Sequence, residues 1–205
     1  MARLYAFMVL VFTITLSSAQ DIPKAEIFTG YSLNHVSFPL STQFVLGNGH
    51  GNLQGFELSG TVNANRWFGV VGDFAGYYGT ATSGTLFKPP NCVLCTSGFD
   101  GTVHNVHTFV AGPQLVLRDG KQAYFAHVLF GGASTKADLD QVNGFSVNPS
   151  KTDLSFAMVL GGGFDFAISR HLALRAQPGY LLTRVGGTRA NNFRISGGLV
   201  FRLGP

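Results

Sequence analysis

The sequence predicts an all-β fold: an eight-stranded antiparallel up-and-down transmembrane β-barrel, preceded by a cleaved signal peptide. Three observations lead to this prediction. The chain is apolar but poor in charge, apolar and polar residues alternate along most of it, and short and long connections follow one another in turn. Hydrophobic residues make up 45% of the 205 residues and charged residues 12%, about half the share of a typical soluble domain. The mean hydropathy is +0.22.

The apolar residues are not grouped into membrane helices. Past the first twenty positions, no apolar stretch approaches the roughly 20 residues that a membrane helix needs. A barrel that faces lipid explains both facts, because its apolar residues occur at every second position. The 27 glycines and 19 phenylalanines suit crowded strands with an apolar outer face. The length fits one domain.

The beginning of the chain has the features of a signal peptide. Met1–Arg3 is a short positive segment, Leu4–Leu16 is apolar, and Ser17–Ala19 supplies small residues before Gln20. The apolar run is short for a membrane helix, and no cysteine follows the cleavage site, so a lipoprotein anchor is not indicated. We expect residues 1–19 to be removed and residues 20–205 to form the barrel domain. Loss of Arg3 lowers the formal net charge from +4 to +3, too mild to suggest a nucleic-acid partner.

Alternation with a period of two predicts eight strands of about nine to twelve residues, the length that a tilted strand needs to cross a bilayer. In most of them one face is apolar and the other polar, but the facing of the fourth strand is unclear. The predicted strands are Ala25–Leu33, Leu53–Val62, Trp67–Tyr78, Val103–Leu117, Gln122–Gly131, Ser155–Phe166, Leu172–Thr183 and Asn192–Leu203.

The connections between these strands alternate in length, as periplasmic turns and outer loops do in membrane barrels. Asp119-Gly120 is a strong signal for a tight hairpin, because both central residues tolerate a positive φ. The predicted short turns are Asn63–Arg66, Arg118–Lys121 and Ala167–His171. The predicted outer loops are Asn34–Asn52, Gly79–Thr102, Gly132–Leu154 and Arg184–Asn191.

The composition of the polar face decides which face points inward. A soluble lipocalin-like barrel would turn its polar face outward. Here that face mixes Gly, Ser and Ala with few charges, which is too thin to solvate an exterior but suits a narrow lumen. We therefore expect Glu57, Asp73 or Asp165 to pair with Arg175 or Arg194 inside the barrel. The apolar face would meet lipid, with interfacial aromatics at Trp67, Tyr77, Tyr78 and Tyr180.

Four segments resemble the outer membrane protein A-like family of small β-barrels. They are Glu26–Ser32, Asn65–Asp73, Phe125–Gly132 and the final strand, and the resemblance covers about Ala25 to Leu203. It implies a barrel of this type, outer-membrane lipids and lipopolysaccharide as surroundings, and the barrel-assembly machinery as a partner during biogenesis. We expect a monomer. The residues that look like the assembly signal are Ser196, Gly198, Phe201 and Leu203, although the chain continues to Gly204-Pro205.

Two cysteines, Cys92 and Cys95, lie in the longest predicted loop. In an exported chain this pair is read first as a disulfide. A zinc site with His104 and His107 is disfavoured, because residues three apart on a strand point to opposite faces. We expect no metal and no cofactor.

Three function classes remain. The main expectation is a non-enzymatic outer-membrane protein whose exposed loops serve adhesion or ligand recognition. A narrow channel is the first alternative, and a lipid A acyltransferase or deacylase is the second. Such an enzyme needs a serine, a histidine and a carboxylate within hydrogen-bond reach, whereas the six histidines are scattered. We expect His127 to be a packed, hydrogen-bonded residue of the lumen.

Overall fold

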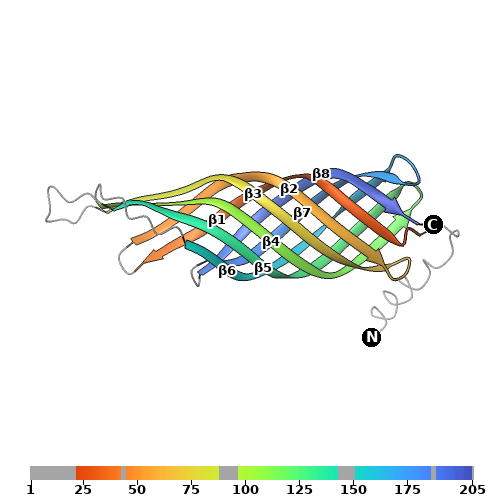
Figure 1. Ribbon diagram of the computed structural model, residues 1–205, viewed down its shortest axis with the longest axis horizontal. Coiled ribbons are helices and arrows are strands. Elements are labelled where there is room, and N and C mark those ends of the chain that lie inside the picture. Colours follow the sequence, from red (N-terminus) through yellow and green to blue (C-terminus); the bar gives the residue numbers. More distant parts are fainter. Residues whose placement is uncertain (1–21, 43–44, 88–96, 143–150, 186–187, 205) are drawn as a thin grey trace, which may run out of the picture.

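A computed structural model describes residues 22–42, 45–87, 97–142, 151–185 and 188–204. The predicted signal peptide and the Cys92–Cys95 pair lie outside these residues. Each strand pairs antiparallel with the next, and β8 returns to β1, which closes the barrel (Figure 1). The predicted fold class is confirmed. The strands are β1 Ala25–Thr42, β2 Val45–Asn63, β3 Phe68–Phe87, β4 Ser97–Asp119, β5 Gln122–Val142, β6 Lys151–Ala167, β7 Leu172–Val185 and β8 Thr188–Leu203.

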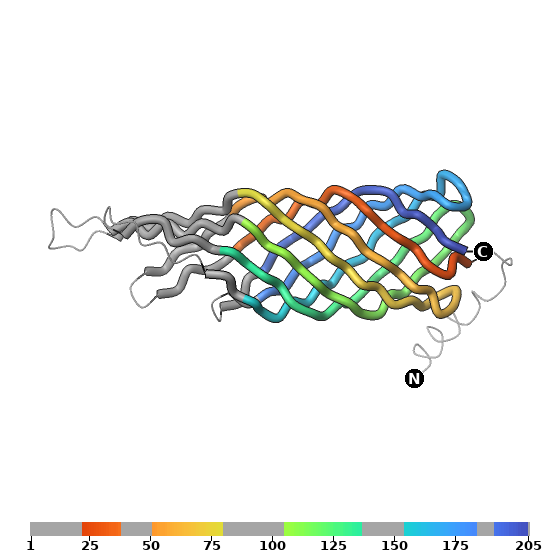
Figure 2. Tube along the Cα trace, in the orientation of Figure 1, coloured from red at the N-terminus to blue at the C-terminus, as the bar shows by residue number. Residues whose placement is uncertain are grey.

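The strands are longer than predicted, with 14 residues in β7 and 23 in β4. Much of what was predicted as outer loop is therefore strand. The β1–β2 ladder shows this, because it continues without interruption from Ala25–Val62 to Thr42–Val45. Asn34–Asn52 has no clear alternation of apolar residues, but backbone hydrogen bonds between paired strands do not require one. The strands are inclined to the barrel axis and wind around it (Figure 2).

The three predicted short turns are confirmed, and they lie at one end of the barrel, which we call the turn end. In the β2–β3 turn, the Oδ1 atom of Asn65 accepts hydrogen bonds from the backbone nitrogens of Trp67, at 2.8 Å, and Phe68, at 2.9 Å. In the β4–β5 turn, Gly120 has a φ of 59°, which glycine adopts without a steric penalty. β1 begins and β8 ends at this same end (Figure 1). The opposite end is the loop end.

The outer surface of the barrel is apolar. Large side chains such as Phe109, Leu115 and Phe156 point outward and are 57–61% exposed. Their neighbours on the same strands point inward and are buried, so the predicted assignment of the two faces is confirmed. An outer surface of this kind is stable in the hydrocarbon of a bilayer. No helix among the described residues is long and apolar enough to cross a membrane.

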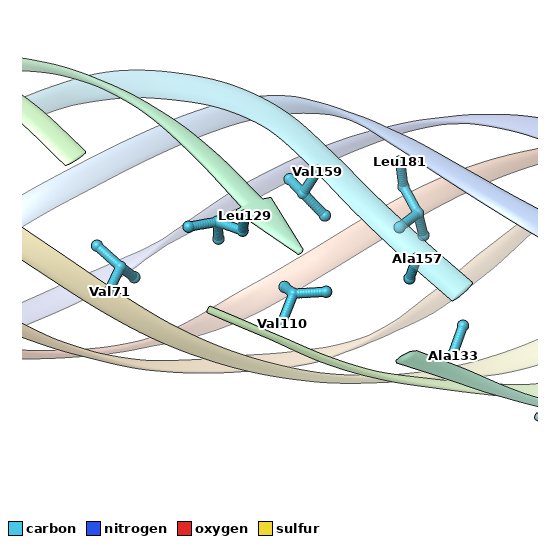
Figure 3. Close-up of a cluster of buried hydrophobic side chains, with 7 residues drawn as sticks. All are labelled: Val71, Val110, Leu129, Ala133, Ala157, Val159 and Leu181. Atoms are coloured by element: carbon cyan, nitrogen blue, oxygen red, sulfur yellow. The ribbon is translucent and has the colours of Figure 1, made fainter. Parts of the chain in front are cut away.

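The facing of β4 is resolved by the structure. Phe109, Leu115 and Leu117 point outward, whereas Val106 and Val110 point inward. Both faces of this strand are apolar, so alternation in the sequence could not distinguish them. The inward valine at position 110 belongs to an apolar cluster that β3 to β7 supply (Figure 3). This cluster fills one side of the interior and consists of Val71, Val110, Leu129, Ala133, Ala157, Val159 and Leu181.

Toward the loop end, the apolar outer band gives way to polar residues. On β1 and β2, His35, Asn52 and Gln54 follow the outward aromatics Tyr31 and Phe56 along the strands. The Nδ1 atom of His35 lies 2.7 Å from Oδ1 of Asn52, and the Tyr31 hydroxyl donates a hydrogen bond to Oε1 of Gln54. Both strands continue past this level, to Thr42 and from Val45. The barrel is therefore taller than its apolar band on this side.

Candidate functional site

The polar part of the interior contains two groups of ion pairs. The first, which we call the turn-end cluster, consists of Glu26, Arg118, Asp165 and Arg175. Arg175 contacts Asp165 through Nε at 2.7 Å and through Nη2 at 2.8 Å, and its Nη2 also lies 3.2 Å from Oε2 of Glu26. Arg118 reaches the other carboxylate oxygen of Glu26 at 3.1 Å. Two carboxylates and two guanidinium groups thus neutralise one another close to the turns.

The Arg175 side chain is also held by aromatic rings. Its guanidinium carbon lies 4.3 Å from the ring centre of Phe125 and 5.5 Å from that of Phe28. Both rings point inward and are buried. A guanidinium group packs well on aromatic faces while its edges donate hydrogen bonds. The turn-end cluster therefore holds this part of the interior together by packed side chains as well as by charge.

The second group, the mid-barrel cluster, consists of Glu57, Asp73 and Arg194 and lies farther along the strands. Arg194 on β8 donates from Nη1 and Nη2 to the two oxygens of Asp73 on β3, at 3.3 and 2.9 Å. Its Nη2 also lies 3.6 Å from Oε1 of Glu57 on β2. Arg194 and Glu57 are fully buried. Removal of one partner from such a buried pair leaves an uncompensated charge, which costs about 3–5 kcal/mol.

Neutral side chains complete the mid-barrel cluster. Gln177 on β7 donates to Oε1 of Glu57 at 2.6 Å, and the Ser196 hydroxyl donates to Oε2. Ser196 also lies 2.8 Å from the Ser32 hydroxyl, which in turn donates to the Tyr77 hydroxyl at 3.3 Å. The chain of contacts runs from β7 and β8 to β1, β2 and β3. It joins strands on different sides of the barrel across the interior.

Tyr77 corrects the predicted set of interfacial aromatics. The sequence suggested an outward ring near a strand end, but Tyr77 is fully buried and its hydroxyl bonds to Ser32 inside the barrel. The physical reason is the strand period, because Asp73, Ala75 and Tyr77 share one face of β3. Tyr78 and Tyr180 do point outward, at 43% and 40% exposure. Trp67 lies in the β2–β3 turn, with the Arg66 guanidinium 4.4 Å from its ring centre.

Glycines make room for polar side chains of the interior. Gly161 on β6 and Gly179 on β7 are paired in register. A Cβ atom on Gly179 would lie 3.1 Å from Nε of Arg194, and one on Gly161 would lie 2.5 Å from Nε2 of His127. The interior is narrow at this level, because Arg194 occupies the space that a side chain on β7 would need.

Several buried polar atoms of the interior have no hydrogen-bond partner among the described residues. Both ring nitrogens of His127 are in this group, so His127 packs in the lumen as expected but no described protein group is hydrogen-bonded to its ring. Gln114 lies opposite His127 on the neighbouring strand, and neither its amide nitrogen nor its amide oxygen has a hydrogen-bond partner in the described part of the chain. The remaining interior examples include the Asn34 amide, the Thr108 hydroxyl and Nε of Arg194. Buried polar groups of this kind are normally satisfied by water.

The sequence identified five members of the two clusters, and the structure brings all five into the lumen: Glu57, Asp73, Asp165, Arg175 and Arg194. It did not identify Glu26 or Arg118 as partners. Both lie at strand ends, Glu26 near the start of β1 and Arg118 near the end of β4, where a charge is normally read as solvated. The sequence nevertheless contained a signal that Glu26 points inward. Glu26 and Phe28 lie on the face of the strand opposite to the apolar residues Ile27 and Tyr31.

The predicted assembly-signal residues divide between the two faces of β8. Ser196 points inward and bonds to Glu57, whereas Phe201 and Leu203 point outward with 43% and 48% exposure. At Gly198 the backbone of β1 is close, since a Cβ atom there would meet Thr29 and Gly30. No group of three or more His, Cys, Asp or Glu side chains in the described residues is arranged to hold a metal ion.

Comparisons with known proteins identify the fold and no family. No protein-family model matches the chain, and no curated protein matches it in sequence. The attachment invasion locus protein Ail of Yersinia pestis is similar in structure, with a TM-score of 0.53 and 20% identity over 88% of this chain and 99% of that one. Neisserial surface protein A has a TM-score of 0.52 and 12% identity over 86% and 97% of the two chains.

A third structural neighbour is the outer membrane protein OprG of Pseudomonas aeruginosa. It gives a TM-score of 0.56 and 11% identity over 91% of this chain and 98% of that one. Identities this low establish the shared architecture alone. The chain therefore has the fold of small eight-stranded outer-membrane barrels.

Proposed function

We propose that this protein is an integral outer-membrane β-barrel that anchors and displays a recognition surface at its loop end. The apolar outer band supports location in a bilayer, and the two ion-pair clusters support an interior that is closed to solutes. An eight-stranded barrel has an interior just wide enough for side chains to fill. Transport of large molecules through the lumen does not fit such an interior.

The observation that carries the display role is the height of the barrel relative to its apolar band. A tilted strand needs about 9–11 residues to cross a bilayer, whereas β4 has 23 residues and β5 has 21. On β1 and β2, the polar residues His35, Asn52 and Gln54 mark where the apolar surface ends. The paired strands beyond this level would raise the four connections of the loop end above the membrane on a sheet.

Recognition of an external ligand is the use we propose for this platform. Ail, which shares the fold, is an attachment invasion locus protein by name. We also propose a relationship to the outer membrane protein A-like barrels. The resemblance of Glu26–Ser32 and of the final strand supports it, since the structure gives both segments a part in the β1–β8 closure.

A non-enzymatic role is part of the proposal. Among the described side chains, no histidine ring is hydrogen-bonded to a serine or a carboxylate. The ring of His35 contacts Asn52, and that of His107 contacts the Tyr78 hydroxyl at 3.2 Å on the outer surface. His127 is inside the barrel and His171 is in a turn at the other end. A serine nucleophile would need a positioned base.

Epitope insertion tests the proposed orientation. One variant carries the tag between residues 146 and 147, and its matched control carries it between Ser169 and Arg170 in the β6–β7 turn. We expect antibody to label intact cells of the first variant, and to label the second only after the outer membrane is permeabilised. Labelling of the turn variant in intact cells would overturn the proposal.

The attachment role needs a second measurement. Cells that express the protein are compared with cells that express a variant whose residues 143–150 are replaced by a Gly-Ser linker of equal length. We expect binding to host-cell or matrix surfaces to fall in the variant, while the amount of folded barrel stays constant. Equal binding by both strains would remove these residues from the proposed recognition surface.

A narrow water-filled path is a second candidate function, favoured by the unpartnered polar atoms of Asn34, Gln114 and His127. Water at these positions could connect the two clusters and carry small ions. Recordings in planar bilayers test this candidate. Discrete single-channel steps from the wild-type protein would support it, and the absence of steps would leave the anchor role alone.

A further inference from the structure

The turn end of the barrel contains a cavity that the display role does not use. It has a volume of about 770 Å³, within the range of small-molecule sites. The β4–β5 turn, the β6–β7 turn and the end of β8 line it. Its charged lining side chains are all basic: Arg118, Lys121, Arg170 and Arg202, with His171 beside them.

The buried carboxylates near this cavity are already paired, whereas Asp119, between the lining residues Arg118 and Gly120, is exposed. Glu26 and Asp165 are buried in the turn-end cluster, where they bind Arg118 and Arg175. Among the described residues, the side chains of Lys121, Arg170 and Arg202 have no carboxylate partner. The Nε atom of Arg202 is buried and has no hydrogen-bond acceptor. The cavity thus combines an unpaired donor with three basic side chains that form no ion pair with any described residue.

The backbone fixes the positions of these basic residues. The backbone nitrogen of Arg202 donates to the His171 carbonyl at 2.9 Å, which attaches the β6–β7 turn to β8. The nitrogen of Ala167 donates to the Lys121 carbonyl at 2.8 Å, which attaches the end of β6 to the β4–β5 turn. The basic side chains therefore arise from three adjacent segments that are held together before any ligand binds. Prior positioning of this kind lowers the entropy cost of binding.

We propose that this cavity is a binding site for a phosphate group. Arginine side chains match phosphate oxygens with paired hydrogen bonds, and a nearby lysine adds a point charge. The lining also includes Ile168, which is 56% exposed beside the basic residues. An apolar side chain next to cations suits a phospholipid headgroup with its glycerol, while a soluble phosphate would use the cations alone. The placement of the site on the periplasmic side rests on the proposed orientation.

Calorimetric titration of the refolded mature barrel in dodecyl maltoside, a detergent without phosphate, tests the site. The two probes are inorganic pyrophosphate and the short-chain lipid dihexanoyl phosphatidylglycerol. We expect saturable binding of at least one probe. Binding of both or of pyrophosphate alone identifies a general phosphate site, and binding of the lipid alone identifies a headgroup site. No saturable binding of either probe by a folded barrel would overturn the proposal.

Three variants locate the binding. R170Q and R202Q should each weaken binding about tenfold, since each removes a charge-assisted hydrogen bond. R66Q is the matched control, because Arg66 is an exposed arginine in another turn of the same end and does not line the cavity. Equal loss in R66Q would show general charge attraction and contradict the site. R170Q keeps the test valid if R202Q fails to fold, because Arg170 is exposed.

The two proposals fail in different ways. Epitope labelling of intact cells reports the orientation and does not depend on the cavity. Calorimetry on the refolded barrel reports the cavity and does not depend on the orientation. Phosphate binding by a barrel whose β6–β7 turn proves to be outside the cell would retain the site and reject its periplasmic location.

Discussion

Arg194 on β8 and Asp73 on β3 are joined by two hydrogen bonds across the barrel interior, at 3.3 and 2.9 Å, although 121 residues separate them in the sequence. Arg194 also lies 3.6 Å from Glu57, and its side chain occupies the space beside Gly179. The Arg194–Asp73 ion pair connects the last strand to the first half of the chain across the interior, in addition to the hydrogen bonds of the sheet.

Replacement of Asp73 by asparagine should destabilise the barrel by about 3–5 kcal/mol, because the buried Arg194 would lose its bidentate partner. The free energy of unfolding in urea can be followed through the fluorescence of Trp67, the single tryptophan of the chain. Asp119→Asn is the control, since Asp119 is exposed in the β4–β5 turn. Equal unfolding midpoints for the two variants would show that the Arg194–Asp73 pair does not stabilise the fold.

The two ion-pair clusters lie one after the other along the lumen, and ions would have to pass both. Arg194→Ala or Arg175→Ala alone should therefore leave the bilayer conductance close to that of wild type. The double variant should conduct measurably more, because both obstructions are reduced. Single-channel recording of the four proteins at the same salt concentration checks this. A large increase from Arg194→Ala alone would show that the turn-end cluster is not a barrier.

Gly179→Ala should destabilise the barrel by about 1–3 kcal/mol, as extra atoms do in a packed interior. The new methyl group would lie 3.1 Å from Nε of Arg194 and 3.2 Å from its Cγ. Gly72→Ala is the matched control on the outer face, where an added Cβ meets nothing within 4 Å. Urea unfolding of both variants distinguishes them. A larger loss of stability in Gly72→Ala would mean that glycine is required at these positions for its backbone conformation and not for the space that it leaves.

Asn65→Ala should destabilise the β2–β3 turn by about 0.5–1.5 kcal/mol, because two backbone donors lose their acceptor. The hydrogen bonds from Trp67 and Phe68 to Oδ1 of Asn65 are the ones removed. Asn65→Asp keeps the oxygen acceptor and should restore most of the stability. Thermal unfolding by circular dichroism measures both variants. If Asn65→Asp is as unstable as Asn65→Ala, the acceptor is not the cause.

The sequence predicts the strands well where lipid and lumen impose opposite requirements. On β8, Phe193, Ile195 and Phe201 alternate with Arg194 and Ser196, and the structure keeps that assignment. Prediction was weak on β4, where valines line an apolar side of the interior. It also ended the strands too early, because pairing beyond the bilayer depends on backbone hydrogen bonds that leave no periodic pattern.

The candidate site was predictable in its members but not in its connections. Alternation places Glu57, Asp73 and Arg194 on the inner face, yet only the barrel register brings β8 opposite β3. Glu26 and Arg118 were missed because each lies near the end of a strand, where charges are normally exposed. Tyr77 was misplaced because its nearness to a strand end was given more weight than its shared face with Asp73. The basic cavity joins three turn and strand ends, a proximity that no local pattern encodes.

The contacts across the lumen have a consequence for biogenesis. Each arginine of the two clusters except Arg118 lies in the last two strands, while Glu26, Glu57 and Asp73 lie in the first three. Glu57 and Asp73 are therefore synthesised first and stay without a counterion until Arg194 on β8 arrives, whereas Glu26 already finds Arg118 on β4. Unpaired carboxylates strongly oppose insertion into lipid. A chain that stops before β7 should then remain outside the membrane, where proteases of the envelope can remove it.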